Sequence, residues 1–237
     1  MQWKLAAVAL LALALGGCFD VTAKSDFRDD GTASVAIEVG VADQVAALAS
    51  GIARENNQPD LMNDCDKPPP PPLVAGTRWI RGVKGRRGDM ATCTSYFEVD
   101  DPLLAVQSIN SRLAALGRSP TVELQDLSLT RLDENSYRLT GTLRAQAPSG
   151  PGHRKRPNLA QALFATSMVD RFVTVSISAQ RIHNATGNLS DDRRTVTWRV
   201  PLITLLQPPQ GYEQEIRADI VYRLTWFDRL RRLFGLD

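Results

Sequence analysis

The stretch FDVTAKSDFRDDGTASVAIEV, residues 19–39, decides the fold, because apolar or small side chains alternate with polar ones along both of its halves. In residues 19–27 the alternation has the period of a strand with one buried face. Residues 28–31, Arg-Asp-Asp-Gly, have the composition of a turn, and the alternation resumes over residues 33–39. The sequence therefore predicts a β-hairpin.

Further segments of the chain show the same alternation. In the stretches between them, apolar residues recur at the spacing of a helix. Helices are expected near 41–55, 101–116 and 158–169, the second opened by an Asp101-Pro102 cap. A phase change between Leu124 and Leu127 indicates a bulge. Strands are expected near 77–83, 90–99, 122–132, 137–145, 173–179, 196–200 and 216–222.

Hairpins that are followed by helices favour the α+β class. We expect an antiparallel sheet built from hairpins, with helices packed against it and an amphipathic C-terminal helix over residues 224–237. In this helix Leu224, Phe227, Leu230 and Phe234 fall near one face, and Trp226 lies where an interfacial anchor would sit. The same stripe would serve either a membrane surface or the protein core.

The first residues have the pattern of a secretory signal. Lys4 precedes an apolar run that is too short to span a bilayer, and Leu15-Gly16-Gly17-Cys18 resembles a bacterial lipobox. This resemblance implies a signal peptide over residues 1–17, diacylglycerol on Cys18 and an acylated new amine. The alternative is an ordinary cleaved signal whose Cys18 stays a thiol or pairs.

Composition bounds the rest of the chain. With 237 residues, 43% of them hydrophobic, the chain is long enough to bury a core, and we expect one α+β envelope domain over residues 18–223. The formal net charge of +2 predicts no particular partner. No apolar run after the signal is long enough to span a bilayer, so a lipid on Cys18 would be the main membrane attachment.

Two further cysteines, Cys65 and Cys93, lie in a chain expected to be exported. A disulfide between them is the favoured interpretation, because the compartment is oxidising. A redox pair or a thiolate metal site is the alternative, although neither cysteine belongs to a CxxC motif.

Five consecutive prolines, residues 68–72, favour a stiff polyproline II segment and predict a spacer over residues 67–72. Recognition of a PxxP motif by a partner is the alternative.

Two basic clusters are expected on loops, the first being a hairpin tip after residue 80. The default for such clusters is solvated charge, and the functional alternative is contact with anionic lipid headgroups. Nucleic acid is not expected, because no aromatic residues are interleaved with these charges. The clustered residues are Arg81, Lys84, Arg86, Arg87, Arg154, Lys155 and Arg156.

Motifs of catalysis and cofactor binding are absent from the sequence. It contains no G-x-S-x-G, H-E-x-x-H, P-loop or dinucleotide fingerprint, and His153 and His183 sit in no metal motif. Paired aspartates fall at turns or helix starts, where they serve local hydrogen bonds. We therefore expect no enzyme, no cofactor and no metal site.

Residues 181–187, RIHNATG, followed by residues 194–202, RTVTWRVPL, resemble the late "N.G" turn and "tvtW.vpl" strand of bacterial lipoproteins of the LppM type. A lipobox followed at once by a hairpin is also similar to that group. The resemblance implies a surface-anchored α+β domain able to bind lipid or glycolipid, without catalytic residues. Members of that group often end in a hydrophobic span, whereas this chain ends in an arginine-rich amphipathic segment.

These observations together predict a lipid-anchored envelope lipoprotein that faces the periplasm or the exterior. We expect it to bind a lipid, a glycolipid or an envelope partner without catalysis. A structural or assembly factor that holds another envelope protein, through a sheet edge or the proline run, is the second hypothesis. An envelope hydrolase that uses unrecognised carboxylates is the third.

Overall fold

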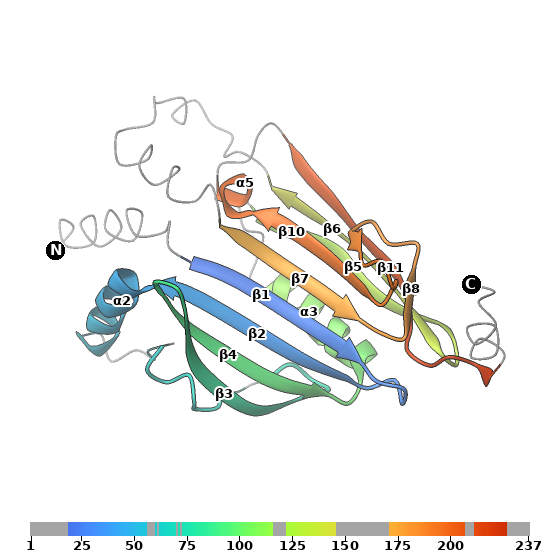
Figure 1. The fold of residues 1–237 in the computed structure, drawn as a ribbon, viewed down its shortest axis with the longest axis horizontal. Coiled ribbons are helices and arrows are strands. Elements are labelled where there is room, and N and C mark those ends of the chain that lie inside the picture. The colour runs from blue at the N-terminus through green and yellow to red at the C-terminus, as the bar shows by residue number, and fades with distance from the viewer. Residues whose placement is uncertain are drawn as a thin grey trace.

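The computed structural model describes residues 19–55, 60, 62–69, 71, 73–115, 122–145, 171–206 and 211–226. Two sheets form the fold, and Figure 1 shows the smaller one behind part of the larger one. In spatial order, sheet A contains β3 (Thr77–Arg87), β4 (Met90–Val99), β2 (Ala33–Ala42), β1 (Phe19–Phe27), β7 (Phe172–Ser178), β10 (Thr195–Pro201) and β9 (Asn188–Leu189). Sheet B contains β5 (Val122–Asp133), β6 (Ser136–Ala145), β11 (Tyr212–Val221) and β8 (Arg181–His183).

The hairpin predicted from residues 19–39 is confirmed as β1 and β2. They pair in antiparallel register from Phe19 opposite Val41 to Phe27 opposite Ala33. Gly31 closes the turn with a φ of 85°, in the left-handed region that glycine adopts without strain. A Cβ there would also lie 3.3 Å from the ring of Tyr222, so the turn packs directly on the core.

Two other local predictions are confirmed in detail. The backbone N–H of Leu104 donates to Asp101 Oδ1 over 3.0 Å, so Asp101 caps α3 (Pro102–Ala115). The phase change in β5 is a bulge: its register with β6 shifts between Gln125 and Ser128, and Asp126 has a φ of 52°. The helix expected over 41–55 is α2 (Asp43–Glu55).

The prediction of an α+β fold with an antiparallel sheet is wrong, since the described chain is mostly β. Its helices are α2, α3 and the short α5 (Leu202–Leu206), and β1 pairs in parallel with β7, so sheet A is mixed. The physical reason is that the sheets bury one another. The core joins Phe27, Ile177 and Trp198 of sheet A to Leu139 and Ile220 of sheet B.

The predicted C-terminal amphipathic helix is not among the described helices, and residues 227–237 lie outside the described chain. The described part ends at Trp226, which is 71% exposed. The helix expected at 158–169 also falls outside it. Within the described ranges, no helix has the length and apolar character needed to cross a membrane.

A buried carboxylate sits on sheet B. Asp219 on β11 accepts hydrogen bonds from Arg138 on β6, at 2.6 and 2.9 Å, and from Asn184, at 2.7 Å. The bond from Arg138 is the main reason why the pKa of Asp219 lies below its ordinary value. The folded state therefore binds fewer protons at this site than the unfolded state does.

We expect part of the acid sensitivity of the fold to come from Asp219. Its contribution to stability is complete above the unfolded pKa of about 3.9, and it is lost as the pH falls through the lower folded pKa. An Asp219→Asn variant should lose less stability than wild type between about pH 5 and pH 2, measured by urea unfolding. Asp26→Asn, an exposed position on β1, is the control. Equal acid slopes for wild type and Asp219→Asn would contradict this expectation.

Candidate functional site

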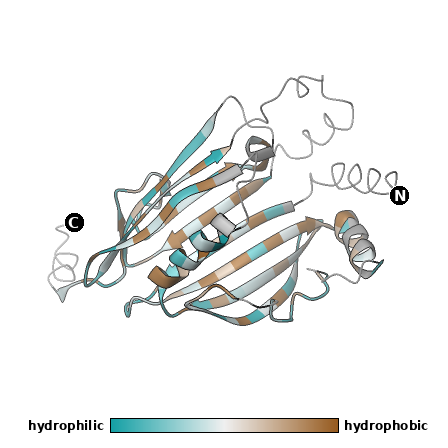
Figure 2. Ribbon diagram, turned by 180° about the vertical axis from the view of Figure 1, so that it is seen from behind, coloured by the Kyte–Doolittle hydropathy of each residue, from teal (hydrophilic) through white to brown (hydrophobic). Residues whose placement is uncertain are grey.

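An apolar cavity of about 400 Å³ lies under the inner face of sheet A, the face that also carries α3. This volume lies within the roughly 300–1,000 Å³ of small-molecule sites. Figure 2 shows α3 crossing this face, with apolar and polar bands alternating along the strands. Its lining residues are Ser25, Phe27, Ala33, Val35, Ile37, Pro69, Leu73, Val74, Thr77, Phe97, Val99, Pro102, Ala105, Val106, Ile109, Arg112, Leu129, Leu139, Ile177 and Ile220.

The strand register explains why the sheet supplies an apolar floor. Residues directly opposite on neighbouring strands point to the same face. Ser25 on β1 lies opposite Ile177 on β7 and Val35 on β2, and Val35 lies opposite Phe97 on β4. One continuous row of side chains therefore crosses four strands. The alternation that predicted each strand also produced this floor.

The helix α3 covers the floor with one stripe of its surface. Pro102, Ala105, Val106, Ile109 and Arg112 recur at helical spacing and all line the cavity. Pro102 and Ala105 are buried. Val106, Ile109 and Arg112 are half-buried. Towards sheet B, Leu139 and Ile220 belong to the buried core, so the cavity is closed there.

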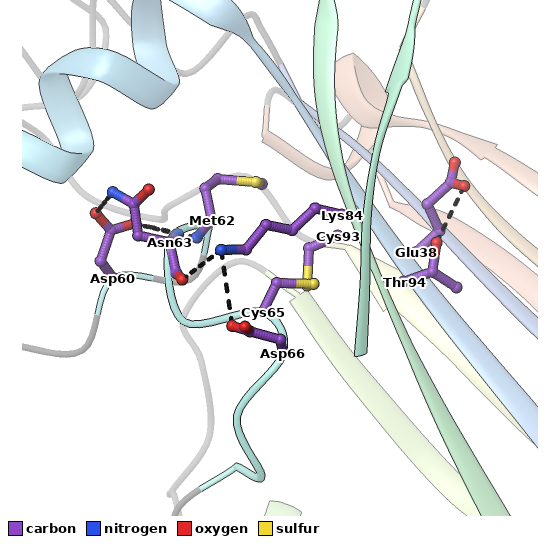
Figure 3. Close-up of a disulfide and its surroundings, with 9 residues drawn as sticks. All are labelled: Glu38, Asp60, Met62, Asn63, Cys65, Asp66, Lys84, Cys93 and Thr94. Atoms are coloured by element: carbon purple, nitrogen blue, oxygen red, sulfur yellow. Dashed lines mark hydrogen bonds and ion pairs between the residues drawn. A yellow bond between two sulfur atoms is a disulfide. The ribbon is translucent and has the colours of Figure 1, made fainter. Parts of the chain in front are cut away.

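The third wall is the strap, which consists of the described residues 62–69, 71 and 73–76 ahead of β3. The Cys65–Cys93 disulfide joins it to β4, and both cysteines are at most 4% exposed. Beside the disulfide, Lys84 Nζ donates to the Asn63 carbonyl over 2.7 Å and lies 3.6 Å from Asp66 Oδ1 (Figure 3). The predicted disulfide is thus confirmed, and it holds one end of the strap on the sheet.

The other end of the strap runs antiparallel to α3. The backbone N–H of Asp100 donates to the Gly76 carbonyl over 3.0 Å, and that of Ala75 donates to Ser108 Oγ over 3.0 Å. One turn further along α3, Arg112 donates to the Leu73 carbonyl. The described residues of the strap and the helix therefore lie side by side over the inner face of β2 and β4.

Few polar groups reach the cavity. Thr77 Oγ1 donates to the Val74 carbonyl over 2.7 Å, and no described residue hydrogen-bonds the hydroxyl of Ser25. Arg112 is the one charged side chain among the described lining residues. Such a cavity suits a ligand that is mostly hydrocarbon.

The first basic cluster lies on β3, not in a loop, and most of its charges have intramolecular partners. Arg86 pairs with Asp43, Arg87 pairs with Asp20 at 2.8 Å, and Arg81 lies 5.0 Å from the centre of the Tyr96 ring. Their contact with anionic lipid stays a prediction. The second cluster, Arg154, Lys155 and Arg156, lies outside the described residues, as do Cys18, Phe227, Leu230 and Phe234.

Sequence reasoning missed the cavity itself. The sequence predicts a spacer at the proline run, yet Pro69 lines the cavity within the strap. The sequence signal for the strap is Gly82, because a glycine inside an expected strand can mark a close approach of another backbone segment. In the structure, an added Cβ on Gly82 would lie 1.6 Å from the Cys65 carbonyl oxygen. In the described part of the chain, no group of three or more His, Cys, Asp or Glu residues is arranged to hold a metal ion.

Comparison with solved structures finds one of the type that the sequence resembles. The folded domain of the Mycobacterium tuberculosis LppM protein, determined by NMR, is similar at 15% sequence identity and a TM-score of 0.45. The match covers 87% of this chain and 91% of that domain. No family model matches the sequence, and no curated protein matches it. At this TM-score the similarity carries no conclusion about function.

Proposed function

We propose that this chain is a non-enzymatic envelope lipoprotein that holds an apolar ligand, such as the acyl chain of a lipid, in the cavity under sheet A. The observation that carries the proposal is the cavity, because its walls are almost wholly apolar and come from two sheets, a helix and the strap. Burial of hydrocarbon in such a site contributes roughly 0.8 kcal/mol per methylene. The lipobox supports attachment to the membrane through Cys18, next to a source of such ligands.

Filling the cavity is expected to abolish ligand binding. Val106 on α3 lines the cavity, and a Val106→Trp side chain would occupy space that a ligand needs. We expect at least about a tenfold loss of affinity for a dansyl-labelled fatty acid, since two lost methylene contacts already amount to about 1.6 kcal/mol. Fluorescence titration of the chain from residue 18, with Cys18→Ser to prevent lipidation, measures it.

The matched control is Leu104→Trp on the same helix, because Leu104 is 43% exposed and does not line the cavity. Its affinity should equal that of wild type. Native mass spectrometry of the chain purified from an envelope should also find a stoichiometric lipid mass. Failure of wild type to bind the probe, together with a clean apo mass, would refute the proposed function.

A further inference from the structure

We propose that the ligand carries a neutral oxygen, as a hydroxyl or a carbonyl, partway along its hydrocarbon chain, and that the hydroxyl of Ser25 hydrogen-bonds this oxygen. This inference rests on the proposed function and specifies the class of its ligand. Ser25 on β1 lines the cavity, and no described residue hydrogen-bonds its hydroxyl. The other hydroxyl of the described lining, that of Thr77, donates to the Val74 carbonyl.

Apolar side chains surround Ser25 on the inner face of sheet A. Val35 and Ile177 lie directly opposite it on the two neighbouring strands. Along its own strand, the adjacent positions of the same face are Ala23 and Phe27. Serine therefore stands where the alternation of β1 calls for an apolar residue, and such departures are typical of functional positions. An unpaired hydroxyl beside an apolar wall is costly, which favours an occupant that can hydrogen-bond it.

Ser25 lies partway between the open and the closed end of the cavity. Along β2, the exposed fraction of the lining side chains falls from 37% at Ile37 to 1% at Ala33, with the half-buried Val35 between them. Because Ser25 lies opposite Val35, two residues, or about 7 Å, separate it from the closed end at Ala33. A zigzag of C–C bonds of about 1.5 Å places about five carbons in that length. We therefore expect the oxygen about five carbons from the end of the chain.

The volume of the cavity sets the length of the probes. A water molecule occupies about 30 Å³ in the liquid, so 400 Å³ holds on the order of a dozen groups of that size. A methylene is of similar size, so a ten-carbon acid fits with its carboxylate at the open end. Decanoate, 3-hydroxydecanoate, 5-hydroxydecanoate and 10-hydroxydecanoate share this chain and this carboxylate. They differ only in whether, and where, the chain carries a hydroxyl.

Competition of these probes against a dansyl-labelled fatty acid tests the inference, in the chain from residue 18 with Cys18→Ser. We expect 5-hydroxydecanoate to bind about fivefold more tightly than decanoate, which corresponds to one neutral hydrogen bond. The hydroxyl of 10-hydroxydecanoate would reach the apolar closed end without a partner, so this probe should bind at least about tenfold more weakly than decanoate. The hydroxyl of 3-hydroxydecanoate stays near the open end, so its affinity should equal that of decanoate.

A ketone probe distinguishes the two sources of the oxygen. The carbonyl of 5-oxodecanoate only accepts hydrogen bonds, whereas a hydroxyl both donates and accepts. If 5-oxodecanoate binds as tightly as 5-hydroxydecanoate, Ser25 donates and a chain with a carbonyl fits the site. If only the hydroxyl compound gains affinity, Ser25 accepts and the ligand is a hydroxylated chain. Both results support the inference.

The variant Ser25→Ala should remove the advantage of 5-hydroxydecanoate over decanoate and leave the affinity for decanoate within about twofold of wild type. Ser25→Thr keeps a hydroxyl and should retain part of the preference. Ser95→Ala is the matched control, because Ser95 is half-buried on the same face of β4, opposite Ile37, and is not among the described lining residues. Its ratio of affinities should equal that of wild type.

The outcomes separate the two proposals. If no probe binds to wild type, decanoate included, the proposed function fails. If all the probes bind alike, or if the preference for 5-hydroxydecanoate persists in Ser25→Ala, the cavity binds hydrocarbon without a contact to Ser25. Either of these two results overturns this inference and leaves the proposed function standing.

Discussion

Replacing Gly82 with alanine is expected to destabilise the fold by about 3 kcal/mol and to lift the strap from strand β3. An added Cβ would lie 1.6 Å from the carbonyl oxygen of Cys65 and 2.6 Å from its carbonyl carbon. Both are backbone atoms, so no rotation of a side chain can relieve the overlap. Overpacking of a well-packed site typically costs roughly 1–3 kcal/mol, and this overlap belongs at the upper end.

Two other glycines are matched controls for this substitution. A Cβ on Gly51, within α2, meets no atom within 4 Å, so Gly51→Ala should stabilise the helix by roughly 0.5–1 kcal/mol. A Cβ on Gly85 lies 2.8 Å from Thr92 Oγ1, which is the end of a side chain that can rotate. Gly85→Ala should therefore cost less than Gly82→Ala does.

Urea unfolding at neutral pH measures all three variants, and an unchanged m-value would attribute the shifts to stability. A Gly82→Ala variant as stable as wild type would show that the strap does not rest on β3. Because the strap forms one wall of the cavity, loss of its contact with β3 should also weaken binding of the dansyl-labelled fatty acid.

Local elements could be predicted from the sequence because their signals are local. The Asp101-Pro102 cap, the hairpin of residues 19–39 and the bulge of β5 each depend on a few neighbouring residues. The sequence predicts a loop at the basic stretch for a related reason, since Arg86 and Arg87 resemble a polar turn. In the structure they extend β3, because their side chains reach Asp43 and Asp20 on other elements.

The pairing of the sheets could not be predicted from the same patterns. Alternation shows that one face of β1 and one face of β7 are buried, but it does not identify a neighbour. Val21 lies opposite Val173 in a parallel pair, across about 150 residues of intervening chain. The cavity is a product of such long-range pairing, since Ile177 reaches its floor only through it. The predicted fold class is wrong for the same reason. Alternation shows that one face of a strand is buried, but whether a helix or a second sheet packs on that face depends on distant parts of the chain.

The disulfide and the close approach at Gly82 both involve Cys65, where the strap contacts the sheet. Removal of the disulfide is the second change that we expect to have a large effect on stability. The double variant Cys65→Ser with Cys93→Ser is expected to lose about 3–4 kcal/mol, because the bond closes a loop with a sequence separation of 28 and so restricts the unfolded chain. Replacing both cysteines leaves no unpaired thiol at either position. Urea unfolding compares the double variant with wild type under non-reducing conditions.

Without the disulfide, the Cys65 segment is free to move away from β3, so Gly82→Ala should then cost much less than about 3 kcal/mol. The two losses should therefore fall short of additivity by about 1–2 kcal/mol, as is usual for groups in direct contact. Full additivity would mean that the disulfide restricts only the unfolded chain and does not hold the strap against β3. The affinity for the dansyl-labelled fatty acid distinguishes these cases as well. If the disulfide holds the strap against β3, the double variant binds the fatty acid more weakly even where it is fully folded.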